Sequence, residues 1–171
     1  MESAAIGNVE YFTCSNCGNC VEIDKNPKNL NFEIIHRKGS DNTHESFSSN
    51  FMVGELSLLD ILSKNEAGHS DFLGCFARGW DKLNAHSKNQ LLLLSAPEME
   101  SGRRLIYVCP ECADVGCGAY GCEIKKENGF YVWQNFAYEN GYEEPQIIDG
   151  VGPYKFEILE YEKIIHRASE L

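Results

Sequence analysis

Cysteine is the residue type in this chain with the most chemistry to offer, because seven of its eight cysteines fall into two short groups. Thiolates are zinc ligands and nucleophiles, so grouped cysteines could bind a metal ion or carry out redox reactions. Cysteines that only pack in a core have no reason to be grouped in this way. The groups are Cys14, Cys17 and Cys20, and then Cys109, Cys112, Cys117 and Cys122, with Cys75 alone between them.

Each group contains one Cys-x-x-Cys pair, and each pair directly follows a segment rich in β-branched and aromatic residues. A tight turn after a strand directs both sulfurs toward one point, as in the knuckles of zinc-ribbon proteins. One knuckle supplies only two of the four ligands of a structural zinc site. We therefore expect the two knuckles to meet and to bind a structural zinc ion through Cys14, Cys17, Cys109 and Cys112.

Other interpretations of the cysteines stay open at this point. Cys109, Cys112, Cys117 and Cys122 could surround one ion locally, or a histidine such as His36 could replace one cysteine. The thiols could also be inert core residues. A thiol-dependent oxidoreductase using Cys109 and Cys112 is a further alternative, although redox pairs normally open a helix and these pairs follow predicted strands. An ion held by four cysteines leaves no position for water and is structural.

The sequence lacks the motifs of several catalytic classes. It has no glycine-rich phosphate loop, no His-Glu-x-x-His and no Gly-x-Ser-x-Gly, and its five histidines are dispersed. We therefore expect a binding protein rather than an enzyme.

The cysteines must be positioned by the strands and helices around them, and the sequence pattern of these elements predicts an α+β fold. We expect one domain, 1–171, with an antiparallel sheet and a docked C-terminal helix. Strands at 9–13 and 104–108 precede the knuckles. Strands at 119–126 and 130–138 form a hairpin, because Asn128-Gly129 suits a tight turn. The other expected elements are strands at 32–36 and 91–94, a helix or turn at 81–89, a polar loop at 40–50 and a helix at 156–168. Residues 55–62 are expected to form either a short helix capped by Ser57 or a buried strand.

The net charge of −11, from 15 basic and 26 acidic residues, restricts the class of partner. Such a surface repels phosphate backbones, so we expect no direct nucleic-acid binding. The sequence contains no apolar stretch long enough for a membrane span and no signal-peptide pattern at its start, so we expect a cytoplasmic protein with reduced thiols.

An acidic and aromatic segment, 137–145, is the candidate surface for a basic protein partner. Tyrosines supply contact area, and carboxylates beside them steer a cationic protein toward the surface. Our leading hypothesis is an immunity protein that neutralises a basic bacterial toxin such as a nuclease; a zinc-stabilised adaptor domain is the alternative. The candidate partner-binding residues are Tyr138, Glu139, Tyr142, Glu143 and Glu144.

The second cysteine group lies in the motif Tyr107-Val-Cys-Pro-Glu-Cys-Ala-Asp-Val-Gly-Cys-Gly118. With Trp133-x-x-Phe136 and Gly152-Pro153, this motif resembles an uncharacterised bacterial family that carries Cys-x-x-Cys-Gly-Asp-Leu-Gly-Cys-Gly and is often labelled hypothetical protein or oxidoreductase. The resemblance covers roughly residues 80–165. It departs from the family pattern at Ala113, where the family has glycine, and at Cys122, where a small or aliphatic residue is expected. The resemblance implies no particular mechanism.

Overall fold

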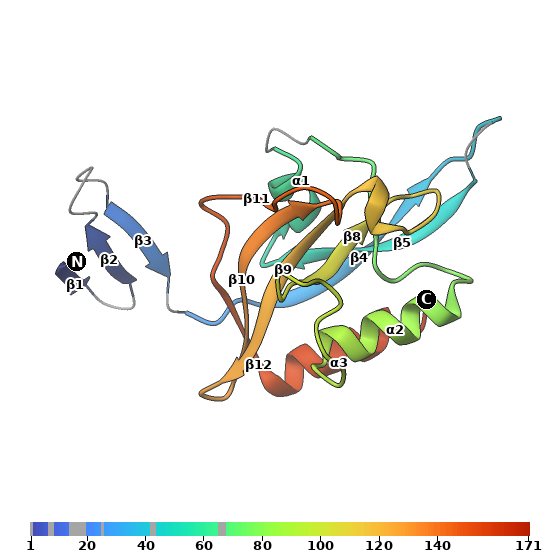
Figure 1. Ribbon diagram of the computed structural model, residues 1–171. Helices are drawn as coiled ribbons and strands as arrows, with labels where there is room; N and C mark the ends of the chain where they lie inside the picture. The colour runs from blue at the N-terminus through green and yellow to red at the C-terminus, as the bar shows by residue number, and fades with distance from the viewer. Residues whose placement is uncertain (1, 7–8, 14–19, 25, 42–43, 65–67) are drawn as a thin grey trace.

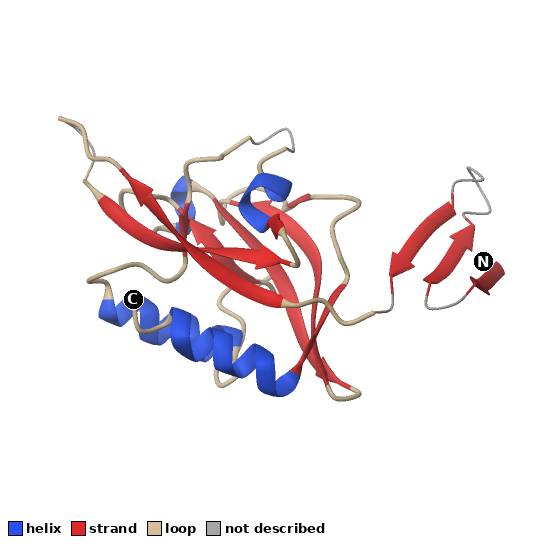
Figure 2. Cartoon of the chain, turned by 180° about the vertical axis from the view of Figure 1, so that it is seen from behind, coloured by secondary structure: helices blue, strands red, loops and turns tan. Residues whose placement is uncertain are grey.

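The computed structural model describes residues 2–6, 9–13, 20–24, 26–41, 44–64 and 68–171, and it has the expected α+β architecture (Figure 1). All strand pairings in this part of the chain are antiparallel. Figures 1 and 2 show α2 and α3 side by side along one side of the sheets, with α1 on the other side. The helices are α1 (Leu58–Leu62), α2 (Asp81–Leu91) and α3 (Ile158–Ala168).

The largest sheet has six strands in the order β11-β10-β9-β8-β7, with β12 also paired to β10. Its centre is the expected hairpin, in which Asn128 and Gly129 have the positive φ angles of 49° and 84° that a tight turn requires. Both faces of β10 are buried near Trp133, as expected for a central strand. The strands are β7 (Leu73–Gly74), β8 (Arg104–Val108), β9 (Ala119–Glu127), β10 (Phe130–Glu139), β11 (Gln146–Ile147) and β12 (Tyr154–Glu157).

A second sheet corrects the prediction of a polar loop over 40–50, because β5 begins inside that range. The polar side chains of β5 are buried where this sheet meets the larger one: the Ser49 N–H donates to the Phe76 carbonyl at 2.9 Å, and the Gly74 N–H donates to Ser48 Oγ at 3.2 Å. A Cβ at Gly74 would overlap the Ser49 carbonyl, so only glycine permits this approach. The strands are β4 (Leu30–Arg37), β5 (Ser46–Val53) and β6 (Leu56–Ser57).

The first strands of the chain form a small sheet of their own, in the order β1-β2-β3. The expected strand at 9–13 is β2, and it ends directly before the first cysteine pair. Cys14 and Cys17 lie outside the described residues. The strands are β1 (Glu2–Ile6), β2 (Val9–Thr13) and β3 (Cys20–Asp24).

The four-leucine run at 91–94 is the end of helix α2 and not the predicted buried strand. Leu93 adopts a left-handed conformation, with φ 59°, and its N–H donates to the Gln90 carbonyl. The Leu94 N–H reaches back to the Asn89 carbonyl at 2.8 Å. These two bonds form a Schellman cap, in which leucine takes the place that glycine usually holds. Leu94 is 70% exposed as a result.

The main core joins both long helices to the larger sheet. On α3, Tyr161, Ile165 and Ala168 are buried at helical spacing, which confirms the expected docking of the C-terminal helix. Trp133 Nε1 on β10 donates to the Tyr161 hydroxyl at 3.1 Å, and that hydroxyl donates to the Leu91 carbonyl of α2 at 2.9 Å. In the part of the chain that the structure describes, no helix is both apolar enough and long enough to cross a membrane.

Candidate metal centre

The second knuckle is a tight turn at the end of β8. Cys109 follows the last residue of the strand, and its carbonyl accepts a hydrogen bond from the Ala113 N–H at 3.0 Å. Ala113 closes this turn in a left-handed conformation, with φ 54°. The positive φ explains why glycine suits this position, since a Cβ opposes such a backbone. The turn directs the side chains of Cys109 and Cys112 to the same place.

A second turn brings Cys117 back to the knuckle. Asp114 organises it: its side chain accepts from the Gly116 N–H at 2.7 Å, and its carbonyl accepts from the Cys117 N–H at 3.1 Å. The turn is a short 3-10 helix, Val115–Cys117. An aspartate at this position is a typical helix cap. The two turns together fold the loop back on itself.

The result is a cluster of three sulfurs. The sulfurs of Cys109, Cys112 and Cys117 lie within 4.8 Å of one another, and those of Cys112 and Cys117 are 3.4 Å apart. Thiolates bound to one tetrahedral ion at about 2.3 Å are roughly 3.8 Å from each other, so the spacing fits a shared metal ion. Cys109 is buried while Cys112 and Cys117 are exposed, which leaves the cluster open to an incoming ion.

The structure brings some of the predicted metal ligands together and places others elsewhere. It brings Cys109 and Cys112 together, as expected, and adds Cys117, which the sequence placed only in the alternative local site. Cys122 is not part of the cluster, because it is fully buried in the main core, on β9 opposite Arg104. Among the described residues, the alternative of a local site with all four of these cysteines is therefore wrong. The predicted pairing with Cys14 and Cys17 stays a prediction, because both lie outside the described residues.

Cys109 and Cys117 differ in the direction in which their pKa values are shifted. Burial acts to raise the pKa of Cys109, but hydrogen bonds from two backbone N–H groups and two thiols outweigh it and lower that pKa. Hydrogen bonds to Cys112 and Cys109 raise the pKa of Cys117 to about 11. Cys109 is therefore the first of these two thiols to become a thiolate, and its negative charge is stabilised by the other members of the cluster.

Two neighbouring elements adjoin the knuckle. Arg37 of β4 forms a salt bridge with Glu111, inside the knuckle, with Nη1 and Oε1 2.7 Å apart. On another side, Cys112 lies in the wall of an open cleft of about 630 Å³, beside Trp80 and Leu83 at the start of α2. His36, considered as a mixed ligand, instead contacts Glu45 at 2.7 Å.

The acidic and aromatic segment, 137–145, packs against the cysteine loop. A Cβ at Gly118 would overlap the ring of Tyr138, and a Cβ at Gly116 would lie 3.1 Å from the hydroxyl of Tyr142. Both glycines flank Cys117. The loop that carries the third sulfur therefore forms part of the support for this segment.

One of the predicted partner-binding residues is not available at the surface. Glu139 is 3% exposed, and its Oε1 accepts from Arg103 Nη1 at 3.0 Å and from Ser101 Oγ at 2.6 Å. Arg103 also donates through Nε to the Asn135 carbonyl, at an irregularity in β10. Glu139 therefore joins the end of β10 to the turn that precedes β8, and it is unsuited to partner contact. Tyr142, Glu143 and Glu144 remain exposed, and Tyr138 is half-buried.

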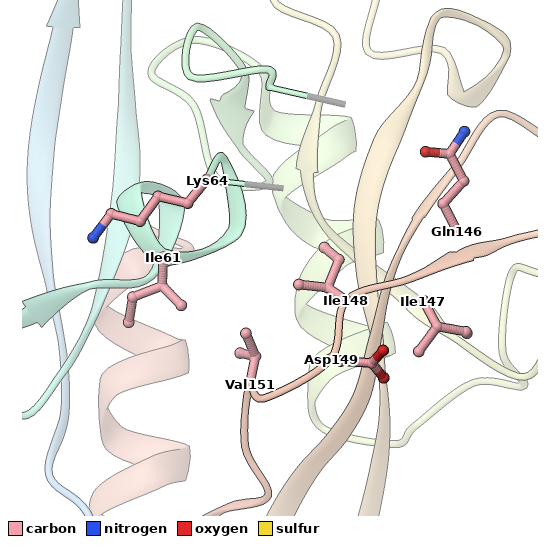
Figure 3. A pocket seen from close by; sticks show the side chains of 7 residues that line it. All are labelled: Ile61, Lys64, Gln146, Ile147, Ile148, Asp149 and Val151. Carbon is pink, nitrogen blue, oxygen red and sulfur yellow. The ribbon is translucent and has the colours of Figure 1, made fainter. Parts of the chain in front are cut away.

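A separate cavity of about 450 Å³ lies between α1 and the segment around β11 (Figure 3). Its walls are mainly aliphatic, and the ammonium group of Lys64 points away from the other lining side chains. It holds no cysteine or histidine and so adds nothing to the chemistry of the cysteine cluster. The lining residues are Ile61, Lys64, Gln146, Ile147, Ile148, Asp149 and Val151.

Comparison with protein-family models gave no match, and comparisons with curated proteins and with solved structures gave none either. The function is therefore argued from the geometry of the chain alone.

Proposed function

We propose that this chain is a non-catalytic zinc-binding protein that binds a basic protein partner through its acidic and aromatic segment. The partner class that fits best is a basic bacterial toxin, which makes the protein an immunity protein. Cys109, Cys112 and Cys117 are three of the zinc ligands, and a cysteine of the first knuckle, Cys14 or Cys17, supplies the fourth.

The donor set supports zinc. Three thiolates on one short loop favour zinc over magnesium or calcium, which prefer oxygen ligands. Bound there, the ion would cross-link the two turns of the loop and stabilise them. The folding free energy of small cysteine sites is commonly coupled to metal binding in this way.

The observation that carries the proposal is the contact between the cysteine loop and the acidic segment. Gly116 and Gly118 on one side meet Tyr142 and Tyr138 on the other, and a Cβ at Gly141 would lie 3.6 Å from Val115. A metal that fixes the loop therefore also fixes the backbone of the segment. Such preorganisation lowers the entropy cost of binding a partner.

Charge and exposure support a basic partner. Tyr142 is 85% exposed, and Glu143 and Glu144 follow it at the surface. The half of the chain from residue 98 onward contains 14 acidic and 7 basic residues, so the segment lies in the more acidic half. An exposed tyrosine beside carboxylates suits a cationic surface.

The test is binding to the basic product of an adjacent toxin gene, measured by calorimetry. Glu143→Lys with Glu144→Lys should weaken binding by about tenfold or more, since charge reversal at an interface costs several kcal/mol. Glu55→Lys with Glu170→Lys changes net charge equally at exposed sites outside the segment and should have a much smaller effect. Equal losses in both double variants would contradict a local interface, and metal binding without any basic partner would favour an adaptor domain.

A further inference from the structure

We infer that Cys112 and Cys117 are a redox modification site: they form a reversible disulfide when the chain meets a small-molecule disulfide such as oxidised glutathione. The inference rests on the proposed function in one respect only, namely that the bond also removes from the metal two of the three ligands that this loop supplies.

The short distance between their sulfurs favours a disulfide between Cys112 and Cys117. The sulfurs of Cys112 and Cys117 are 3.4 Å apart, and a disulfide requires them to approach to about 2.05 Å. The residues between them include Gly116, and Gly118 follows the pair. Disulfides require specific geometry, and a short loop of this composition can adjust to it.

Exposure distinguishes this pair from three other cysteines. Cys112 and Cys117 are exposed, whereas Cys75, Cys109 and Cys122 are buried. An oxidant of the size of glutathione disulfide reaches a thiol only at the surface. The cleft of about 630 Å³ beside Cys112 gives that reagent room next to one sulfur, between Trp80 and Leu83.

The chemistry is two successive thiol–disulfide exchanges. The Cys112 thiolate attacks one sulfur of the oxidant, the oxidant's S–S bond breaks, and one glutathione thiolate leaves. The Cys117 thiol then loses its proton to water, and its sulfur attacks the Cys112 sulfur of this mixed disulfide and displaces the second glutathione thiolate. Two electrons pass from the cysteine pair to the oxidant. The two protons that the cysteine thiols release balance the two that the glutathione thiolates take up from water. The oxidant is the only co-reactant.

The consequence reaches the partner surface. A disulfide sulfur is a far weaker metal ligand than a thiolate, so the oxidised loop keeps only Cys109. The same loop contacts Tyr138 and Tyr142 through its two glycines. Oxidation therefore removes both the ion and the support that it gives to the acidic and aromatic segment.

The experiment treats the full chain with oxidised glutathione, alkylates the remaining thiols with iodoacetamide under denaturing conditions, and maps the tryptic peptide 105–125 by mass spectrometry. This peptide contains four cysteines. We expect alkylation at Cys109 and Cys122 only, with no fragment ions from cleavage between Cys112 and Cys117. Metal content, measured on the same samples, should fall from about one equivalent to under a tenth of that as the disulfide forms.

Cysteine-to-serine variants identify which cysteine takes part in each of the two exchange reactions. Cys109→Ser should still form the disulfide, and Cys109→Ser with Cys117→Ser should trap a glutathione adduct on Cys112, because no other sulfur of the cluster remains to displace it. Cys75→Ser is the matched control at a buried thiol and should react like the wild type.

Two results would overturn the inference: a disulfide that joins this peptide to the N-terminal peptide, or a fully alkylated peptide after treatment. A chain that forms the disulfide but never contained metal supports the inference and contradicts the proposed zinc site. A chain that binds metal but forms no disulfide supports the proposed zinc site and contradicts the inference.

Discussion

Gly118 lies directly against the ring of Tyr138, so closely that any side chain at Gly118 would overlap the phenol. The backbone at Gly118 also has a φ of 96°, which disfavours every other residue type. One glycine thus joins the last turn of the cysteine loop to the strand that leads into the acidic segment. This contact makes the loop and the segment a single structural unit.

Gly118→Ala should therefore destabilise the protein twice over. The backbone at Gly118, with φ 96° and ψ 147°, is one that essentially only glycine adopts, and it costs about 1–3 kcal/mol for a residue with a Cβ; overpacking against Tyr138 adds about 1–3 kcal/mol. Gly129→Ala isolates the first effect, because Gly129 has a φ of 84° and nothing lies within 4 Å of its Cβ position. Chemical denaturation of both variants gives the comparison, and equal losses would contradict the packing contact.

Ala113→Gly should stabilise the knuckle. Ala113 has a φ of 54°, so glycine relieves a strain of about 1 kcal/mol, and the resulting gain is reduced by the greater freedom of glycine in the unfolded chain. We expect tighter metal binding and an unchanged or slightly higher melting temperature. Ala85→Gly, at an exposed position in the middle of helix α2, is the contrasting control and should destabilise by about 1 kcal/mol. A loss of stability in both would contradict a strained turn at Ala113.

The buried pair of Arg103 and Glu139 should be structural. Glu139→Ala leaves the Arg103 guanidinium buried without its carboxylate, which costs about 3–5 kcal/mol. Glu144→Ala, at an exposed glutamate of the same segment, should change the free energy of unfolding by less than about 0.5 kcal/mol. Denaturation midpoints measure both. A stable Glu139→Ala protein with weakened partner binding would instead return Glu139 to the interface.

Metal affinity should increase with pH through the neutral range. The pKa of Cys117 in the metal-free protein is about 11, so this thiol is protonated at neutral pH and must lose its proton when the metal binds. Calorimetry in buffers of different ionisation enthalpy should show release of about one proton or more per ion at pH 7. The pKa of Cys109 is lowered, so its share of the released protons should decline first as pH rises. Binding without proton release would contradict ligation by Cys117.

Local patterns in the sequence predicted local structure well. Asn128-Gly129 identified the central hairpin, and Ser57 was correctly expected to cap a short helix, where its hydroxyl accepts from the Asp60 N–H. Both features depend on residues within one turn. The fold class followed from the same kind of evidence, since strands and the C-terminal helix have distinct periodicities.

Features that depend on distant contacts were not predictable in this way. The strand through Ser48 and Ser49 appears polar in sequence, and it is stabilised by partners on β7 and the residues after it. Glu139 belongs to an acidic segment of the sequence, yet its carboxylate is buried in a salt bridge with Arg103, the residue directly before β8. The role of Cys117 had a local signal in the Asp114 cap and the following glycines, but the turn was needed to interpret it.

In the proposed function, Cys109, Cys112 and Cys117 bind one metal ion. The most direct measurement is titration of the anaerobic, metal-free chain with Co²⁺, followed through the thiolate-to-cobalt charge-transfer absorption and then through displacement of cobalt by zinc. We predict saturation at about one equivalent, loss of the absorption in Cys109→Ser, Cys112→Ser and Cys117→Ser, and its retention in Cys75→Ser and Cys122→Ser. An absorption that survives in Cys117→Ser, or a wild-type chain that shows none, would contradict the account.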